Sequence, residues 1–186
     1  HTRSLCDWSS DGCSSSRRMV CHLGALSSTT ERDVDAIIAN NFRLTSDLWN
    51  WGAQRGIRFI YASSAAVYGD GSGGFDDDLD LAAMAALRPL NPYGWSKWMV
   101  EKILGSFQQA HGLTPMILRY FNAAGADPEG EIGENHHPES HLIPLTLQAA
   151  TGERPSFTLF GEDYATPDGT CIRDYIHVSD LAEAHV

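Results

Sequence analysis

The feature that most constrains the fold is a regular alternation of strand-like and helix-like segments along the chain. Residues 57–64 read IRFIYASS, an apolar run rich in β-branched and aromatic side chains, which is typical of a buried strand. Helical patterns cover 31–56 and 90–112, and strand-like runs cover 19–26 and 114–125. This order predicts parallel strands joined by crossover helices, that is, an α/β fold with a doubly wound, Rossmann-like sheet.

The helix predicted over 90–112 carries the clearest end signals. Asn91 can cap its first turn and Pro92 suits the first helical position. Gly112 is suited to its C-terminus. In 31–56 the apolar residues recur at spacings near 3.6, and this helix is predicted to end at Gly56.

The chain divides into three predicted regions. Residues 1–18 are Ser-rich without a usable period and are interpreted as an irregular leader, while 19–125 form the sheet domain and 126–186 part of a second, substrate-binding region. Beyond Gly125 the pattern predicts a short helix at LIPLTLQAATG, strands at FTLFG and at 172–178, and a last helix capped by Ser179. No GxxGxxG turn is present, so we expect an N-terminally truncated sheet domain and a chain that stops inside a helix.

Composition and charge exclude several classes of protein. The 186 residues contain 13 Lys and Arg against 24 Asp and Glu, a formal net charge of −11, which argues against nucleic acid or an anionic membrane as a partner. No apolar run approaches the ~20 residues of a membrane span. Four scattered cysteines do not suit a disulfide framework, so we expect a cytoplasmic protein.

Three residues suggest acid–base chemistry on an alcohol. Tyr93 and Lys97 are spaced i and i+4, so they share one helix face, and a nearby ammonium lowers the pKa of a phenol. Ser64 ends the strand 57–64, at the sheet edge where parallel sheets bind ligands. The YxxxK spacing alone is weak, but its combination with Ser64 and with Asn122 on the following strand predicts a catalytic site.

These motifs resemble a known family. SSAAVYG (63–69), NPYGWSK (91–97) and RYFNAAGA (119–126) are similar to segments of the extended short-chain dehydrogenase/reductase family. The likeness runs from about residue 19 to 186. It implies a nucleotide-binding Rossmann-like domain, NAD as cofactor, a UDP-sugar as substrate, and a homodimer formed through the helices at 31–56 and 92–112.

The resemblance also implies a role for individual residues. Ser64, Tyr93 and Lys97 would be catalytic, with Tyr93 as the general base. The residues implied to bind NAD are Leu23, Gly24, Ala25, Asn41, Ser63, Tyr93, Lys97 and Tyr120. The residues implied to bind the substrate are Ser64, Tyr93, Asn122, His141, Leu142, Phe160 and Arg173. Two alternatives stay open: Phe160 could be a core residue, and Arg173 could form a surface ion pair with Asp174 or Glu162.

Two halves of the chain resemble different branches of this family. The first, to about Lys97, is similar to enzymes that epimerise an ADP-linked heptose at C6, and the second to enzymes that epimerise UDP-hexoses at C4. Dehydratases of the family carry an Asp-Glu pair where this chain has Ala65 and Ala66, and the heptose enzymes carry a lysine after RYFN that is absent here. We therefore expect 4-epimerisation of a UDP-hexose; the alternatives are heptose epimerisation and an inactive fragment unable to hold NAD.

No metal site is expected. His136, His137 and His141 lie in an acidic loop without the spacing of a helical zinc motif. They are interpreted as solvated loop histidines.

Overall fold

The computed structural model describes residues 19–72, 74–75, 77 and 81–186, and the predicted leader lies outside this part of the chain. The chain forms two compact units, the first ending at Tyr120 and the second running over Phe121–Val186. The boundary therefore falls slightly before Gly125, where the sequence predicted it. Each unit is described by itself.

A parallel three-stranded sheet forms the centre of the first unit. Its strands are β1 (Met19–His22), β2 (Arg58–Ser64) and β3 (Met116–Tyr120), in the order β1-β2-β3. Val20 pairs with Phe59 and Tyr61 pairs with Ile117, so all three strands run in the same direction. The predicted α/β fold with a parallel sheet is confirmed.

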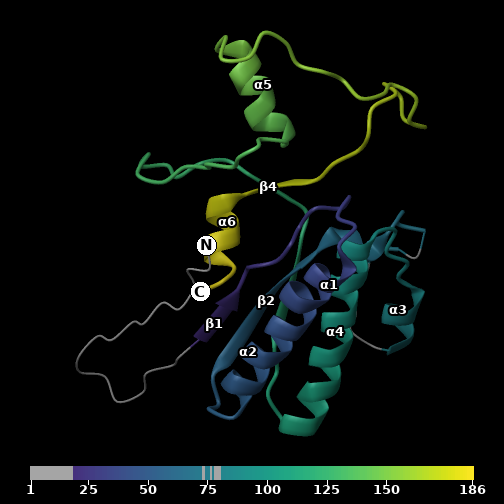
Figure 1. Ribbon diagram of the computed structural model, residues 1–186, viewed down its shortest axis with the longest axis vertical. Helices are drawn as coiled ribbons and strands as arrows, with labels where there is room; N and C mark the ends of the chain where they lie inside the picture. Colours follow the sequence, from purple (N-terminus) through teal and green to yellow (C-terminus); the bar gives the residue numbers. More distant parts are fainter. Residues whose placement is uncertain (1–18, 73, 76, 78–80) are drawn as a thin grey trace. The chain divides into compact units, whose positions relative to one another are not determined.

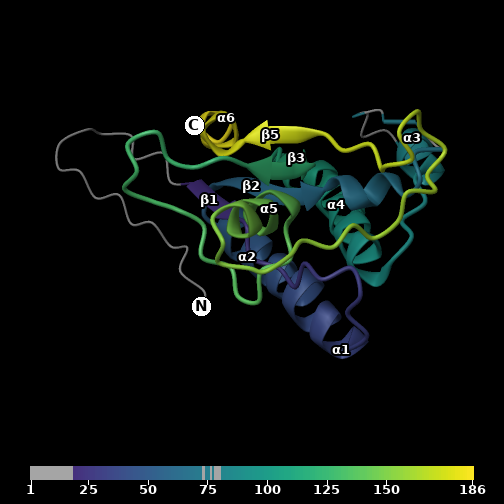
Figure 2. The same ribbon diagram turned by 90° about the horizontal axis from the view of Figure 1, so that it is seen from above.

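The helical segments 34–53 and 92–111 of this unit lie on one face of the sheet (Figures 1 and 2). The predicted helix over 31–56 is α1 (Val34–Ile37) and α2 (Leu44–Ala53), joined by a π-helical segment, η1 (Ile38–Arg43). The predicted helix over 90–112 is α4 (Pro92–His111). Asn91 Oδ1 accepts a hydrogen bond from Gly94 N, and Gly112 ends the helix with a positive φ of 68°.

Two shorter helices follow β2 before α4 begins. A 3₁₀ helix, η2 (Ala65–Tyr68), starts directly after Ser64, and α3 (Leu81–Ala86) lies in a stretch for which the sequence predicted no helix or strand. None of the helices formed by the described residues has both the length and the apolar composition to cross a membrane.

The core of the first unit lies between the sheet and the two long helices. Trp49 of α2 meets Phe59 of β2 edge to face, with ring centroids 5.5 Å apart. Each such buried side chain contributes about 1.5–3 kcal/mol relative to exposure. The cluster draws on β1, β2, α2, α4 and the residue before β2: Val20, Trp49, Ile57, Phe59, Tyr61, Val100 and Leu104. This packing fixes α4 against β2.

The second unit differs from the sequence prediction in several places. The strand predicted over 114–125 is two strands, because β4 (Asn122–Ala124) pairs with β5 (Tyr175–His177) in a separate parallel sheet. FTLFG forms no strand. The predicted short helix is α5 (Leu142–Ala150), and α6 (Val178–Glu183) is capped by His177, whose ring accepts from Ser179 N, rather than by Ser179.

Candidate functional site

Ser64 and Tyr93 meet where β2 ends and α4 begins. Ser64 is the last residue of β2, and its Oγ accepts a hydrogen bond of 3.1 Å from Ala66 N. Tyr93, in the first turn of α4, lies near enough to Ser64 for the Ser64 side chain to act on the pKa of the phenol. The strand-end hydroxyl and the helix-borne phenol are therefore neighbours, and their catalytic role stays a prediction.

Gly94 makes this approach possible. A Cβ built at Gly94 would lie 2.7 Å from Ala66 O and 3.1 Å from Pro89 Cβ. Only a residue without a side chain fits so close to the backbone of η2. Gly94 thus lets the start of α4, and Tyr93 with it, reach the end of β2.

Lys97 lies one helical turn after Tyr93 and is buried. Its Nζ donates a 2.6 Å hydrogen bond to Ala62 O and sits 4.8 Å from the centroid of the Tyr61 ring. Burial lowers the pKa of Lys97 to about 8, although the charge of Glu101 acts in the opposite direction. Lys97 is therefore an ammonium with a reduced affinity for its proton, held on the face that Tyr93 shares.

The expected effect of Lys97 on Tyr93 is not what the structure shows. Lys97 Nζ lies 5.7 Å from the centroid of the Tyr93 ring. Burial raises the pKa of Tyr93, while the Ser64 side chain acts to lower it. The protein alone therefore favours the neutral phenol, because desolvation opposes the phenolate.

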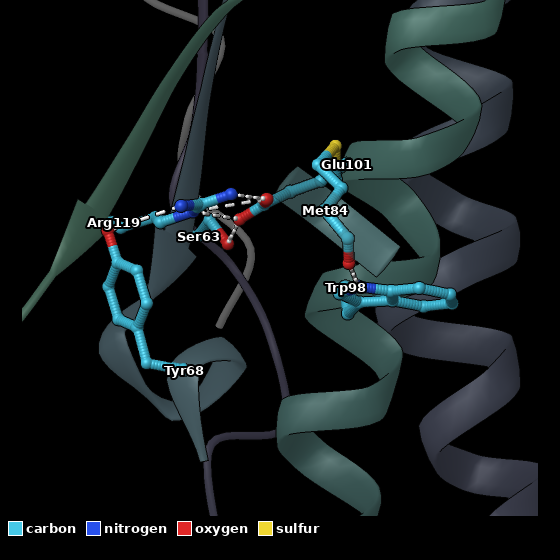
Figure 3. Close-up of polar contacts among 6 residues, drawn as sticks. All are labelled: Ser63, Tyr68, Met84, Trp98, Glu101 and Arg119. Carbon is cyan, nitrogen blue, oxygen red and sulfur yellow. Dashed lines mark hydrogen bonds and ion pairs between the residues drawn. The ribbon is translucent and has the colours of Figure 1, made fainter. Parts of the chain in front are cut away.

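A buried ionic network supports the same corner of the sheet, and sequence reasoning missed it (Figure 3). Glu101 of α4 accepts hydrogen bonds from Arg119 of β3, with Arg119 Nη2 to Glu101 Oε2 at 2.7 Å, and the two side chains are 0% and 6% exposed. Glu101 also accepts from the Ser63 hydroxyl. Arg119 donates to Tyr68 Oη at 3.2 Å. The available signal was spacing, because Glu101 follows Lys97 at i+4.

The network shows what the Ser63 hydroxyl contacts, while the contact of Ser63 with NAD implied by resemblance stays a prediction. Ser63 is 2% exposed and its hydroxyl points to Glu101. Ser64, the next residue, projects to the opposite side of the strand, as alternation requires. Ser63 therefore anchors β2 to α4, and Ser64 is the hydroxyl that reaches Tyr93.

The segment after β1 is open to solvent and is held in place by Asn41. Leu23 is 52% exposed, and a Cβ at Gly24 would meet nothing within 4 Å. Asn41, from the π-helical segment, accepts from Leu26 N at 2.7 Å and donates to Leu26 O and Ser96 Oγ. Asn41 is buried and holds this segment in place. Its direct contact with NAD stays a prediction.

The remaining residues expected at the NAD site lie at the ends of strands. Ala25 is partly exposed in the segment after β1, and Tyr120 is the last residue of β3. Burial raises the pKa of Tyr120 to about 12, with a smaller contribution from Cys21. The carboxyl ends of β1, β2 and β3 thus carry the open Gly24 segment, Ser64 and Tyr120 on one edge, which fits the nicotinamide end of a dinucleotide.

Apart from Ser64 and Tyr93, the residues expected to bind the substrate lie in the second unit and are mostly exposed. Phe160 is 89% exposed, so the core alternative is wrong. Arg173 is exposed and forms no ion pair with Asp174 or Glu162, all of which are described. Its role in binding stays a prediction.

Three further substrate candidates lie at element ends of the same unit. Asn122 begins β4, and its Nδ2 donates to Asp174 O at 2.7 Å. His141 is the N-cap of α5 without a side-chain capping bond, and Leu142 is the first helical residue, half exposed. The first turn of α5 therefore presents backbone N–H groups, which favour an anion.

The sequence suggested that the histidines of the loop before α5 are solvated and without partners. Two of them instead contact a carboxylate. His136 and His141 both approach Glu139, at 3.5 Å and 3.0 Å. His137 does not belong to this group.

Comparison with known proteins agrees with the geometry of the first unit. The profile of the NAD dependent epimerase/dehydratase family matches residues 14–186. UDP-glucose 4-epimerase of Rhizobium meliloti (strain 1021) is 45% identical over 172 residues, which are 91% of this chain and 51% of that protein. The chain thus spans about half the length of the curated relatives it matches.

Solved structures give the same result. UDP-glucose 4-epimerase from Brucella ovis in complex with NAD has a TM-score of 0.77 at 41% identity, over 90% of this chain and 51% of that one. The enzyme from Bifidobacterium longum in complex with NAD+ and UDP has a TM-score of 0.72 at 35% identity, over 90% and 50%. With a family profile that covers residues 14–186 and a parallel sheet carrying the Ser64, Tyr93 and Lys97 constellation, the chain belongs to the NAD dependent epimerase/dehydratase family.

Proposed function

We propose that this chain carries the catalytic centre of a UDP-glucose 4-epimerase, which interconverts UDP-glucose and UDP-galactose by transient oxidation at C4. The observation that carries the proposal is the placement of Tyr93, in the first turn of α4, beside Ser64 at the carboxyl end of β2, with Lys97 one turn further on the same helix. The identity of 45% to a named UDP-glucose 4-epimerase supports the choice of substrate.

NAD would bind along the edge formed by the Gly24 segment, Lys97 and Tyr120, and when bound it supplies the hydride acceptor, the returning hydride and a positive charge. Lys97 would contribute its ammonium: Nζ holds Ala62 O and has two further protons to donate, for example to the ribose hydroxyls. Asn41 and Ser96 keep the Gly24 segment in position.

Tyr93 is the general base of the proposed reaction. Its oxygen would take the proton of the sugar 4-hydroxyl as the substrate is oxidised and return it as the sugar is reduced from the other face. Ser64 would donate its hydroxyl proton to the Tyr93 phenolate or to the sugar oxygen. Because burial alone raises the pKa of Tyr93, the phenolate requires the combined positive charge of Lys97 and the bound cofactor.

The second unit would hold the nucleotide diphosphate while the sugar turns. Arg173 offers a planar guanidinium that suits a diphosphate, and the first turn of α5 with His141 offers backbone N–H donors. Asn122 would add an amide donor to the same phosphates. Phe160 offers an exposed ring for a uracil base.

Dehydration is disfavoured by the residues that follow Ser64. Ala65 and Ala66 form the first turn of η2 and carry neither an acid nor a base. Elimination of water from a keto sugar needs such a proton donor and acceptor. Oxidation followed by return of the hydride is the chemistry that the described residues support.

A homodimer and a cytoplasmic location complete the proposal. Trp51 on α2 and Trp95 on α4 are 40% and 42% exposed, and aromatic side chains are enriched at protein interfaces. These are the two helices through which the dimer is expected. Sedimentation of the purified chain tests the dimer, and Trp95→Asp should give a monomer if this face is the interface.

The proposed function is tested by cofactor binding first and turnover second. The purified chain is heated with and without millimolar NAD, and with NAD we expect a higher melting temperature. A coupled assay then compares UDP-galactose with ADP-heptose, and we expect turnover of UDP-galactose. Stabilisation without turnover of either sugar contradicts the proposed function but not the NAD site, and absence of both identifies an inactive fragment.

A further inference from the structure

A histidine–carboxylate cluster lies in the loop before α5, within the second unit. His136 Nδ1 and His141 Nδ1 lie 3.5 Å and 3.0 Å from the same atom, Glu139 Oε1. Glu134 Oε1 lies 3.2 Å from His141 Nδ1. Potential ligand atoms of His136, Glu139 and His141 all lie within 4.8 Å of one another. Two imidazoles and two carboxylates therefore converge within one short stretch of chain.

The spacing of these atoms suits a small divalent cation. A tetrahedral Zn²⁺ with bonds of about 2.0–2.1 Å to nitrogen and oxygen holds its ligand atoms roughly 3.3 Å apart. The contacts of 3.0 Å, 3.2 Å and 3.5 Å fall on both sides of that value. Imidazole nitrogen with carboxylate oxygen is also a donor set that Zn²⁺ accepts.

The backbone orients the carboxylate at the centre of the cluster. Glu139 Oε1 accepts hydrogen bonds of 2.7 Å from both Ser140 N and His141 N. Such supporting bonds hold a ligand in position before a metal arrives. The net charge of −11 further favours a cation over an anion.

We infer that His136, Glu139 and His141 form a Zn²⁺-type metal site, with Glu134 next to it in contact with His141. The site does not depend on the proposed epimerase activity. It does share His141 with the predicted substrate contacts, so a bound metal would take the imidazole away from a diphosphate. Metal binding would then weaken the proposed binding of the diphosphate by the second unit.

The test is a Zn²⁺ titration of the whole chain at pH 7.5 against a chromophoric chelator. Four variants are compared with the unsubstituted chain: His136→Asn, Glu139→Gln, His141→Asn and, as matched control, His137→Asn from the same loop. Cysteines also bind Zn²⁺, so the differences among variants decide. Circular dichroism confirms folding, and because these side chains are largely on an exposed loop we expect every variant to fold.

We expect the unsubstituted chain and His137→Asn to bind Zn²⁺ equally. Removal of one ligand at 136, 139 or 141 should weaken binding by about tenfold or more, since even loss of a supporting contact costs 10–100-fold. Co²⁺ in place of Zn²⁺ should give the visible absorption of a tetrahedral nitrogen and oxygen site. Equal affinity in all five proteins, or equal weakening by His137→Asn, overturns the inference.

Discussion

The two units hold their candidate residues in opposite ways. In the first, Lys97, Glu101 and Arg119 are buried, and the side chains bond to one another and to the sheet. In the second, Phe160 and Arg173 are exposed, and loops are shaped by short-range bonds such as Glu131 N to Asp127 Oδ2 at 2.9 Å. The geometry of the proposed catalytic residues thus depends on the core, whereas that of the proposed substrate-binding residues depends on local turns. Substitutions of the buried charged groups in the first unit should therefore lower stability, and substitutions of the exposed residues in the second should affect binding alone.

The largest effect is expected for Tyr93→Phe. Loss of the phenolic oxygen removes the proposed proton acceptor, which should lower turnover by about 10²–10⁴-fold. NAD binding and the melting temperature should change little, because the ring remains in place. The measurements are the UDP-galactose assay and thermal unfolding with NAD. Turnover within a factor of two of the unsubstituted chain would show that Tyr93 is not the base.

The next largest effect is expected for Glu101→Gln, which tests the dependence of the first unit on its buried charges. Arg119 would be left without a counter-charge, and breaking a buried pair costs about 3–5 kcal/mol. Urea unfolding measures the loss. Replacing both residues by Met should recover most of the stability, because no unpaired charge remains. Glu129→Gln, an exposed change in the second unit, serves as control and should cost less than about 0.5 kcal/mol.

The Glu101–Arg119 pair also shows which contacts cannot be predicted from the sequence. Ser64, Tyr93 and Lys97 could be predicted because strand ends and the i, i+4 helix spacing place side chains by local rules. Glu101 and Arg119 could not, since their pairing depends on how α4 crosses β3. The same reason hid the contacts of Asn41, which the resemblance implied only as an NAD-binding residue: its partners Leu26 and Ser96 are supplied by the fold.

The fold was likewise predictable where local sequence patterns determine the elements, but not where distant segments pair. The parallel sheet and both long helices follow from periodicity and capping. The split of 114–125 into β3 and β4 does not, because it depends on the pairing of Asn122 with Tyr175, far along the chain. The histidine cluster was missed for a different reason: a loop without regular structure gives no spacing rule for which side chains meet.

A pH-dependent effect is expected from Lys97. Its pKa is about 8 in the folded chain against 10.5 ordinarily, so between these values the unfolded chain binds more protons and folding is favoured as the pH rises. The gain reaches about 3 kcal/mol. Lys97→Met should lack it, and the difference between the two proteins, measured by urea unfolding from pH 7.5 to 10, isolates Lys97 from other groups. A difference that does not change with pH would contradict a lowered pKa.

A smaller effect is expected for Gly94→Ala. The new Cβ would lie 2.7 Å from Ala66 O, and such overpacking costs about 1–3 kcal/mol. It should also lower turnover by moving Tyr93 away from Ser64. Gly105→Ala is the control in the same helix: its Cβ meets nothing within 4 Å, so it should stabilise the chain by about 0.5–1 kcal/mol. If both substitutions stabilise the chain, the close contact between α4 and η2 does not require a glycine at Gly94.

The smallest effect on stability is expected for Phe160→Ala in the second unit. Phe160 is 89% exposed, so its truncation removes almost no buried surface and should change stability by less than about 0.5 kcal/mol. Phe59→Ala in the first unit, where the ring is 2% exposed, should instead cost about 3–5 kcal/mol. If Phe160 stacks on a uracil, its loss should still weaken UDP binding by about 1–3 kcal/mol, measured by calorimetry. A substitution that leaves stability unchanged but weakens UDP binding identifies a residue used for recognition and not for packing. Unchanged UDP affinity in Phe160→Ala would remove Phe160 from the substrate site.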